Sequence, residues 1–431
     1  MSSNFCQLSE LANIQGGFAF KGADFQDAGV VVVKIANIHP PSVSIAGADR
    51  IRPDKLIGLD RFKLRDGDVL MAMTGATVGK VGRFREIESA YLNQRVARIT
   101  SKNGSKYDDF IYAVVTQPGF DSLIEGVSAG SAQANISTTG IGSVRIPRLA
   151  LNDQIAIGNI ARVLDDRITL LRETNSTLEA IAQALFKSWF VDFDPVCAKM
   201  EGHTPEGMDE ATAALFPDAM EESELGLVPK GWRVGTLADL SDLNPESWSS
   251  KNHPDMLAYI DLANAKDNEI ASVTDFTFDD APSRARRVLR DGDTIVGTVR
   301  PGNRSFAFIH DPASNLTAST GFAVLRPLTR GNAEFVYLAA TQDASIEHLA
   351  HVADGGAYPA VRPDVVSGLQ CFVPGKHVME EFHAAAAPLF AKVAENQMQA
   401  KTLATLRDAL LPRLISGQIC VSAALEGLEV V

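Results

Sequence analysis

Two long stretches of the chain place apolar residues at alternating steps of three and four, the spacing of a helix that buries one seam. Within residues 152–190 the pattern visits Ile157, Ile160, Leu164, Arg167, Leu171, Thr174, Leu178, Ile181, Leu185 and Ser188. The second stretch visits Phe382, Ala386, Leu389, Val393, Asn396, Ala400, Leu403, Arg407, Leu410 and Leu414. Two such helices in one chain most simply pair with each other, so the pattern predicts an antiparallel coiled coil.

Two residues of the second stretch bear on this pair. Asn396 occupies a seam position, where a polar residue typically fixes the register of a coiled coil. Pro388 lies inside the pattern and cannot donate a backbone hydrogen bond, so the second helix is either kinked at Pro388 or begins there. The helix pair is compatible with simple packing and with a role as a spacer.

Shorter apolar runs bounded by Gly and Asp predict strands elsewhere in the chain. The strand candidates are residues 30–35 and 68–73 in the first domain-sized stretch, and 294–299 and 306–309 further on. In each region the sequence also predicts one short helix, at residues 108–116 and 333–341. The fold class we predict is α+β, with two pseudo-symmetric mixed α/β domains joined by two long antiparallel coiled-coil helices.

The chain repeats itself, and equivalent positions differ by a constant number of residues. We call this difference, the one between Leu64 and Leu289, the repeat offset. The phrase Leu64-Arg65-Asp66-Gly67-Asp68 returns as Leu289-Arg290-Asp291-Gly292-Asp293, and Gly130 falls on Gly355 at the same offset. Both helical stretches end in related phrases, Leu185-Phe186-Lys187-Ser188 and Arg413-Leu414-Ile415-Ser416, where the offset has drifted to a larger value. A repeat of this length indicates a duplicated domain plus helix, which suits a target that itself has two halves.

The net charge of −13 argues against nucleic acid, but the charge is unevenly distributed. Residues 1–150 carry a small basic excess, whereas the segment from Asp192 to Leu225 has ten acidic side chains and one lysine. Within it, residues 196–224 are also rich in Ala, Met and Pro, and we predict a mobile linker there. The charge lowers the expectation of DNA binding without removing it.

Cysteine usage and the apolar runs exclude several classes of protein. The four cysteines form no CxxC pair, so neither a zinc ribbon nor a disulfide framework is expected. The first residues lack a basic segment followed by an apolar run, so no signal peptide is expected. The longest purely apolar run, Val30–Val33, is far too short to cross a bilayer. These features predict a cytoplasmic protein.

Three phrases of the chain resemble the DNA-specificity subunit of Type I restriction–modification systems. They are residues 178–195, which close the first helix, residues 226–232, which open the second domain, and residues 406–417, which close the second helix. The family often opens its helices with a Pro-Pro-Leu-x-Glu-Gln phrase. Here the first copy reads Pro147-Arg-Leu-Ala-Leu-Asn-Asp-Gln154, and the second, residues 374–381, has lost the Gln.

The resemblance implies a non-catalytic subunit without cofactors of its own. Each globular domain would be a target-recognition domain that reads one half of a bipartite site in double-stranded DNA. The helix pair would set the gap between the halves and dock two methyltransferase subunits, and later the restriction subunits. S-adenosylmethionine, ATP and Mg are expected on these partner subunits, and no metal is expected in this chain.

These considerations divide the chain into six segments. Residues 1–150 are the first target-recognition domain, 151–195 the central spacer helix, 196–225 the acidic linker, 226–375 the second target-recognition domain, 376–418 the C-terminal spacer helix, and 419–431 a tail.

Polar side chains at matched places in the two copies are candidates for DNA contact. Gly-containing basic loops can approach phosphates, and Asn, Gln and Arg can bind base edges. In the first domain the candidates are Lys80, Arg83, Arg85, Asn93, Gln94, Arg95, Gln133 and Asn135; in the second they are Arg300, Asn303, Arg304, Ser319, Thr320, Tyr358 and Arg362. The alternative for each is an ordinary turn or a polar strand end.

Aromatic and leucine side chains near the helix ends are candidates for partner docking, because aromatic anchors concentrate interface energy. They are Phe186, Trp189, Phe190, Leu411 and Leu414, with Phe193 close by. The alternative is packing in the core of the adjoining domain.

The sequence lacks the motifs of the obvious enzymes. No methyltransferase Asn/Asp-Pro-Pro-Tyr/Phe element occurs, residues 75–81 fail the spacing of a phosphate-binding loop, and Glu347-His-Leu-Ala-His351 has the wrong order for a zinc helix. The leading hypothesis is a DNA-specificity subunit, and the alternative is a pseudosymmetric protein–protein scaffold that does not contact DNA. A third hypothesis, a diverged enzyme with an unrecognised site, is disfavoured by the absent motifs.

Overall fold

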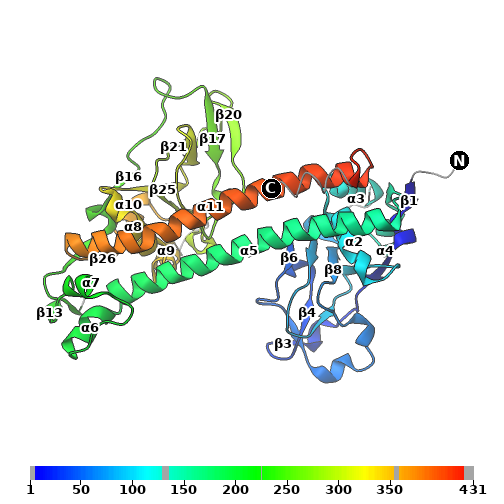
Figure 1. The fold of residues 1–431 in the computed structure, drawn as a ribbon, viewed down its shortest axis with the longest axis horizontal. Coiled ribbons are helices and arrows are strands. Elements are labelled where there is room, and N and C mark those ends of the chain that lie inside the picture. Colours follow the sequence, from blue (N-terminus) through cyan, green and yellow to red (C-terminus); the bar gives the residue numbers. More distant parts are fainter. Residues whose placement is uncertain (1–4, 129–134, 225, 354–358, 422–431) are drawn as a thin grey trace. The chain divides into compact units, whose positions relative to one another are not determined.

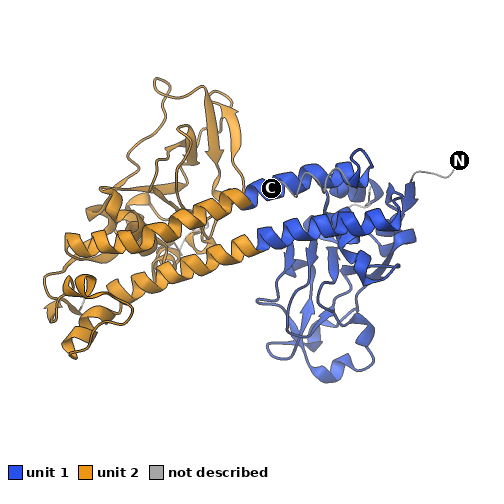
Figure 2. Cartoon of the chain, in the orientation of Figure 1, with its two compact units in different colours: residues 1–169, 400–431 blue, residues 170–399 orange. Residues whose placement is uncertain are grey.

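The computed structural model describes residues 5–128, 135–224, 226–353 and 359–421. It divides into two compact units, coloured separately in Figure 2. Unit 1 comprises residues 1–169 and 400–431, and unit 2 comprises residues 170–399. Each unit contains one α+β body and a part of both long helices.

The two long helices are α5, Leu151–Phe190, and α11, Lys376–Ile415 (Figure 1). Each has 40 residues, and the repeat offset carries both the first and the last residue of α5 onto those of α11. The end phrases predicted a larger offset at the helix ends, and this prediction is wrong because the helix bounds keep the repeat offset. Helix α11 begins before Pro388 and continues through it, so the possibility that it starts at this proline is also wrong.

Helices α5 and α11 pack together in both units, as the apolar seams predicted. In unit 1, Ile157 near the start of α5 shares a hydrophobic core with Leu414 near the end of α11. In unit 2, Phe186 near the end of α5 packs against Phe382 near the start of α11, with ring centroids 6.2 Å apart. The start of one helix thus meets the end of the other, which confirms the antiparallel pairing.

The seam of α5 differs from the predicted one at every second position from Arg167 on. From Ile157 on, the buried side chains are Ile157, Ile160, Ala161, Leu164, Ile168, Leu171, Asn175, Ala182, Phe186, Trp189 and Phe190. The predicted positions Arg167 and Ile181 are exposed, Ile181 to 50%. Alternation starting with a step of four, from Ile157 to Ala161, reproduces the observed seam, whereas we started it with a step of three. The seam predicted for α11 agrees with the burial from Phe382 to Leu414.

The body of unit 1 contains two main sheets and one small two-stranded antiparallel sheet. The larger sheet has the order β2-β11-β8-β9-β6-β5 and the smaller one β10-β4-β7-β3, while β1 pairs with β12. The strands are β1 Phe5–Gln7, β2 Ala12–Gly16, β3 Phe25–Gln26, β4 Val30–Val33, β5 Ile38–His39, β6 Ser42–Val43, β7 Arg50–Ile51, β8 Val69–Ala72, β9 Val81–Arg83, β10 Ala90–Leu92, β11 Val96–Ser101 and β12 Arg145–Pro147. The helices are α1 Leu8–Leu11, α2 Asp108–Thr116, α3 Phe120–Ser128 and α4 Thr138–Ser143.

The body of unit 2 repeats this plan. Its main sheets have the orders β16-β25-β22-β23 and β20-β17-β24-β21, and β15 pairs with β26. The strands are β13 Met220–Ser223, β14 Gly226–Pro229, β15 Arg233–Thr236, β16 Ser241–Leu243, β17 Met256–Ile260, β18 Ala265–Lys266, β19 Glu269–Ile270, β20 Thr274–Thr277, β21 Ala285–Val288, β22 Thr294–Gly297, β23 Phe306–Phe308, β24 Leu316–Ser319, β25 Phe322–Pro327 and β26 Gln370–Val373. The helices are α8 Ala333–Thr341, α9 Asp343–Ala353 and α10 Pro363–Ser367. Helices α2 and α8 occupy the residues predicted for them.

The repeated Leu-Arg-Asp-Gly-Asp phrase is a turn that both units need. Gly67 and Gly292 adopt φ of +84° and +83°, a conformation that other residues rarely take. The carboxylate that ends each phrase accepts from the backbone N–H of the arginine, at 2.9 Å for Asp68 and 2.8 Å for Asp293. The phrase recurs because the glycine and the final aspartate are both required to close this turn before β8 and β22.

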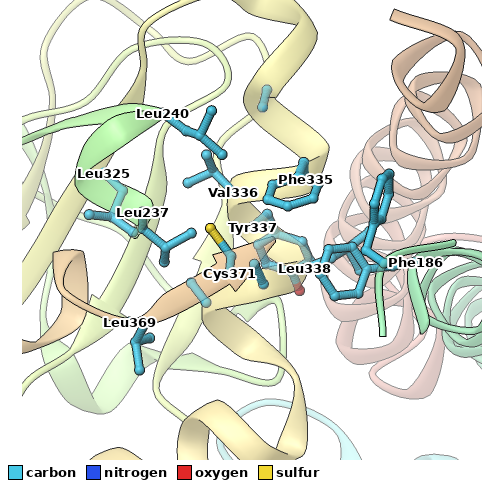
Figure 3. Close-up of a cluster of buried hydrophobic side chains, with 14 of the residues drawn as sticks. Phe186, Leu237, Leu240, Leu325, Phe335, Val336, Tyr337, Leu338, Leu369 and Cys371 are labelled. Atoms are coloured by element: carbon cyan, nitrogen blue, oxygen red, sulfur yellow. The ribbon is translucent and has the colours of Figure 1, made fainter. Parts of the chain in front are cut away.

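The core of unit 2 joins its body to the helices through aromatic side chains. Phe186 of α5 packs edge-on against Phe335 of α8, with ring centroids 5.2 Å apart, and both belong to the cluster drawn in Figure 3. The same cluster contains Tyr337 and Cys371. Fully burying each such side chain contributes roughly 1.5–3 kcal/mol to folding, so this end of the helix pair is anchored strongly to the body.

The acidic segment predicted as a mobile linker is instead folded. It forms α6 Asp194–Met200, α7 Glu210–Ala214 and strand β13, which pairs with β14. Val196 and Phe216 are buried in the core of unit 2, with exposed fractions of 0% and 2%. The few apolar side chains anchor the segment, while the acidic ones remain at its surface, so composition alone gave the wrong prediction.

Candidate nucleic-acid interface

The three candidate loops of unit 1 lie side by side. The Met73 amide donates to the Arg95 carbonyl at 2.9 Å, and the Ile136 amide donates to the Met73 carbonyl at 2.9 Å. An antiparallel bridge between Thr74 and Asn135 extends the contact. The residues after β8 therefore join the loop after β10 to the segment that begins at Asn135. We call residues 73–80, 93–95 and 135–136 the loop edge of unit 1.

Unit 2 has a loop edge made in the same way, from residues 298–304, 319–321 and 359–362. The Thr298 amide donates to the Gly321 carbonyl, and the Val361 amide donates to the Thr298 carbonyl, both at 2.9 Å. Val299 and Ala360 form the matching antiparallel bridge. The repeat offset relates the Val299–Ala360 bridge to the Thr74–Asn135 bridge of unit 1. It also relates the bond from the Val361 amide to the bond from the Ile136 amide. The duplication therefore extends to the hydrogen bonds that assemble the candidate site.

In unit 1, four of the candidate side chains are exposed on the loop edge: Lys80, Gln94, Arg95 and Asn135. Lys80 and Arg95 make no ion pair with any residue that the structure describes. Two positive charges and two amides are thus available to an anionic or polar ligand. Gln133 lies outside the described residues.

The other candidates of unit 1 have partners within the protein. Arg83 forms an ion pair with Asp109 at 2.5 Å and lies over the Tyr112 ring at 4.3 Å, and its side chain is only 12% exposed. Burial raises the pKa of Tyr112 to about 12, so this ring remains neutral at ordinary pH. Arg85 pairs with Asp166 of α5 at 2.9 Å.

Asn93 is also engaged within the protein. Only 7% of this residue is exposed, and its side-chain oxygen accepts from the Arg95 amide at 3.3 Å. Asn93 therefore shapes the loop that presents Gln94 and Arg95 and does not face solvent itself.

In unit 2, Arg300, Asn303, Thr320 and Arg362 are exposed on the loop edge. Arg362 pairs with Asp364 at 2.9 Å, but both side chains remain mostly in solvent. The Arg300 backbone has φ of +48° and donates to the Pro359 carbonyl at 2.9 Å. Such a conformation costs a non-glycine residue about 1–3 kcal/mol and is commonest at functional sites.

Two candidates of unit 2 are less available. Arg304 forms ion pairs with Asp267 at 2.5 Å and Asp343 at 2.7 Å. Ser319 is 2% exposed, and its hydroxyl accepts from the Gly321 amide at 3.2 Å. Both stabilise the loop edge from within. Tyr358 lies outside the described residues.

Sequence reasoning missed one residue beside this edge. The Arg284 carbonyl accepts from the Thr320 amide at 2.8 Å, which places the start of β21 next to the candidate Thr320. The signal was the run Arg284-Ala285-Arg286-Arg287. We looked for pairs matched between the two copies, and the counterpart of Arg284 is Leu59, so this arginine escaped notice.

The candidate docking side chains are buried. The exposed fractions of the five residues are 4% for Phe186, 6% for Trp189, 2% for Phe190, 2% for Leu411 and 1% for Leu414. Phe193 is 7% exposed, and its ring packs edge-on against Trp232 with centroids 5.8 Å apart. The packing interpretation is favoured for all of them.

The described residues hold neither a metal-ion cluster nor a membrane-spanning helix. Within them, no group of three or more His, Cys, Asp or Glu side chains is arranged to hold a metal ion. No helix among them combines the length and apolarity needed to cross a membrane.

The fold and the site define a class of protein: a duplicated α+β recognition protein whose two cation-bearing loop edges are borne by bodies attached to one antiparallel helix pair. Residues 3–180 match the family model for the Type I restriction modification DNA specificity domain. Residues 3–180 are therefore similar to the specificity-subunit family of Type I restriction–modification systems.

Two curated relatives are specificity subunits of Type I restriction enzymes, and a solved structure shares the fold. The chain is 26% identical over 345 residues to the Type I restriction enzyme HindI specificity subunit of Haemophilus influenzae, which covers 70% of this chain and 74% of that one. It is 23% identical over 337 residues to the MjaIX specificity subunit of Methanocaldococcus jannaschii, covering 76% and 73%. The fold is similar to that of the S subunit of a Type I system from M. genitalium, with a TM-score of 0.52, 14% identity and 95% coverage of both chains.

Proposed function

We propose that the chain is the DNA sequence-specificity subunit of a Type I restriction–modification complex, in which each α+β body reads one half of a bipartite site. The observation that carries this proposal is the loop edge, which is assembled by matching hydrogen bonds in both units. Two copies of one recognition surface in a single chain suit a target with two separate parts. The match of residues 3–180 to the DNA specificity domain and the similarity to a curated specificity subunit support this function.

The side chains on the two edges have the chemistry that DNA requires. Exposed Arg95 and Arg300 can bind the O6 and N7 acceptors of guanine, and Gln94 can bind adenine. Lys80 can neutralise a phosphate without reading sequence. The overall charge of −13 does not oppose this reading, because ten acidic side chains lie in the segment 192–225, away in sequence from both edges.

In this proposal the helix pair sets the gap between the half-sites and docks two methyltransferase subunits. The exposed apolar residues of α5 support docking on the outer face of this helix. In unit 2, Leu170 and Ile181 are 52% and 50% exposed, and a separation of eleven positions puts them on one helix face. In unit 1, Val163 of the same helix is 58% exposed. These residues replace the buried Phe186 and its neighbours as candidate contacts.

The proposal assigns the chemistry to the partner subunits. The methyltransferase subunits would bring S-adenosylmethionine, and the restriction subunits ATP and Mg, whereas this chain would be non-catalytic. The complex would act in the cytoplasm, on double-stranded DNA.

The test is to assemble the chain with its methyltransferase subunits, map the methylated bases genome-wide, and measure DNA binding against salt concentration. We expect a motif with two specific halves separated by a gap, and an affinity that falls steeply as salt rises. Absence of both the motif and salt-dependent binding would reject DNA recognition. That outcome would favour the alternative, a pseudosymmetric protein–protein scaffold, for which the acidic net charge is the specific argument.

A further inference from the structure

Arg284 is held in one orientation by a closed network of hydrogen bonds. Its Nε donates to the Tyr259 hydroxyl at 3.0 Å, and its Nη2 donates to Asp261 Oδ2 at 2.7 Å. The Tyr259 hydroxyl in turn donates to the same Asp261 oxygen at 3.0 Å. Three side chains thus form a ring, and two of its bonds fix the plane of the guanidinium.

The supports of this ring are themselves fixed. Tyr259 is 4% exposed, and its position on β17 is set by pairing with β24. Asp261 Oδ1 accepts from the Ala263 amide at 3.2 Å, so the second oxygen of this carboxylate is also anchored. The guanidinium is therefore attached to the sheet and not to a mobile loop.

The free part of Arg284 faces the solvent. Its side chain is 60% exposed, and the donors of Nη1 and one donor of Nη2 are not used by the network. An exposed Arg–Asp pair alone contributes only about 0–1 kcal/mol to stability, so stability is a weak reason for the network. A guanidinium already fixed in one plane loses less conformational freedom when it binds a second partner.

The position of Arg284 beside the loop edge indicates what this second partner is. Its carbonyl accepts from the Thr320 amide at 2.8 Å, and Ala285 pairs with Ser319 in the sheet. Arg284 therefore extends the loop edge of unit 2 by one segment. In unit 1 the equivalent loop has another neighbour, since the Gln94 amide donates to the Phe18 carbonyl at 2.9 Å.

We propose that Arg284 is a specificity-determining residue of unit 2, and that it reads a guanine in the half-site of this unit by binding the O6 and N7 atoms in the major groove. Arginine with two parallel donors matches these two acceptors. The inference rests on the proposed function of the loop edge and adds to it one residue and one base.

A base edge suits Arg284 better than a phosphate does. Asp261 lies 2.7 Å from Nη2, so a phosphate bound at Arg284 would approach a carboxylate of the same charge. The O6 and N7 edge of guanine is neutral and avoids this repulsion. Asp261 is in this scheme a positioning residue, because it acts through the arginine.

Unit 1 has no equivalent of this network. At the repeat offset, the positions that correspond to Tyr259, Asp261 and Arg284 are occupied by Lys34, Ala36 and Leu59. The guanine contact of Arg284 is therefore assigned to the half-site of unit 2 only.

The test compares Arg284→Lys, Arg284→Ala and Asp261→Ala in the complex with methyltransferase subunits. The wild-type motif is determined first, and binding is then measured on sites changed at one base pair at a time. Arg284→Lys keeps the charge but loses the two parallel donors. We expect both Arg284 variants to lose roughly 5- to 150-fold of discrimination at one G·C pair of one half-site. Asp261→Ala should reduce the same discrimination while Arg284 remains.

The matched control is Arg233→Ala. Arg233 is 55% exposed and pairs with Asp239 at 3.2 Å, so it is also an exposed arginine of unit 2 with an aspartate partner, but it lies on β15. Its replacement should leave the discrimination at every position unchanged. Melting temperatures of all variants separate loss of folding from loss of recognition.

Three results overturn the inference while leaving the proposed function intact. The first is a wild-type motif in which the half-site unaffected by Arg95→Ala contains no G·C pair. The second is uniform weakening on all sequences with a salt slope reduced by about one, which indicates a phosphate contact. The third is unchanged recognition in both Arg284 variants. If the wild-type complex shows no salt-dependent DNA binding, the proposed function fails, and this inference fails with it.

Discussion

The two halves of the chain share a backbone but secure it with different side chains. The Ala72 amide donates to the Lys80 carbonyl at 2.9 Å, and at the repeat offset the Gly297 amide donates to the Ser305 carbonyl at 2.7 Å. The ends of the helices differ: α5 ends with Phe186, Trp189 and Phe190, and α11 with Leu411, Leu414 and Ile415 at the equivalent positions. All six are buried. The bodies therefore repeat the same backbone bonds, whereas the helix ends are buried with aromatic side chains in one copy and aliphatic ones in the other.

The two loop edges also share a backbone and differ in their side chains, and this difference bears on function. In unit 1, Lys80 and Arg95 are exposed without a described ion-pair partner. In unit 2, Arg304 and Arg362 have acidic partners, and Arg284 is fixed between Tyr259 and Asp261. A common frame with different charge arrangements is what two different half-sites would require.

The largest effect that separates the two halves is expected at the helix ends. Trp189→Ala removes a ring that packs against Phe216 and Phe382, with centroid distances of 5.0 and 5.7 Å. The expected loss in the free energy of unfolding is about 3–5 kcal/mol, against about 2–5 kcal/mol for Leu414→Ala. The aromatic contacts should put Trp189→Ala near the top of its range. Urea titrations of the full chain, followed by circular dichroism, measure both.

The same variants test whether these side chains dock a partner. If Trp189→Ala leaves the unfolding free energy unchanged and weakens binding of the methyltransferase subunits, the docking interpretation holds and the core interpretation fails. Leu170→Ser, on the exposed face of α5, provides the opposite case, since it should weaken partner binding with little loss of stability.

Local pattern in the sequence was sufficient for the helices and for the repeat. Residues 108–116 and 333–341 form the predicted helices α2 and α8; all of α8 and the run Phe110–Val115 of α2 are buried. The first helical seam was one residue out at every second position from Arg167 on, because the choice of the first step decides the rest of the alternation. The acidic segment was predicted to be mobile because its charges outnumber the apolar anchors that fold it.

The candidate site could be predicted only in part, because ion pairs join residues far apart in the sequence. Arg83 meets Asp109, 26 residues away, and Arg85 meets Asp166, 81 residues away. A sequence motif identifies the arginine, but it does not identify the distant carboxylate with which the arginine forms an ion pair. Matching the two copies pointed to loops that lie side by side in each unit, but it also hid Arg284, which only one copy has.

A smaller effect is expected where a buried polar pair breaks the symmetry of the helices. Asn396 Nδ2 donates to Asn175 Oδ1 at 2.8 Å, and Asn175 Nδ2 donates to the Val393 carbonyl at 3.1 Å. The positions related to this pair by the repeat offset hold Leu171 and Ala400. The pair is therefore present once and not twice, although the helices are duplicated.

Asn175→Leu leaves the Asn396 amide buried without its partner, so we expect a loss of about 1–3 kcal/mol in the free energy of unfolding. The double variant with Asn396→Leu should recover most of this loss, since two apolar residues leave nothing unsatisfied. Urea titrations of the two single variants and the double variant form the cycle that measures the coupling. Additive losses would show that the two amides do not depend on each other.

The smallest effects should distinguish the available charges of unit 1 from the occupied ones. Arg95 and Arg85 are both exposed arginines, but Arg85 pairs with Asp166 at 2.9 Å, whereas Arg95 has no described acidic partner. Arg95→Ala should weaken DNA binding by the complex and, if Arg95 contacts a phosphate, lower the salt slope by about one. A base contact would instead relax one position of one half-site.

Arg85→Ala should leave DNA binding nearly unchanged and cost about 0–1 kcal/mol of stability, because it removes only a surface ion pair. Equal loss of DNA binding in the two variants would mean that DNA displaces Asp166 from Arg85, and that an ion pair in the free protein does not exclude an arginine from recognition.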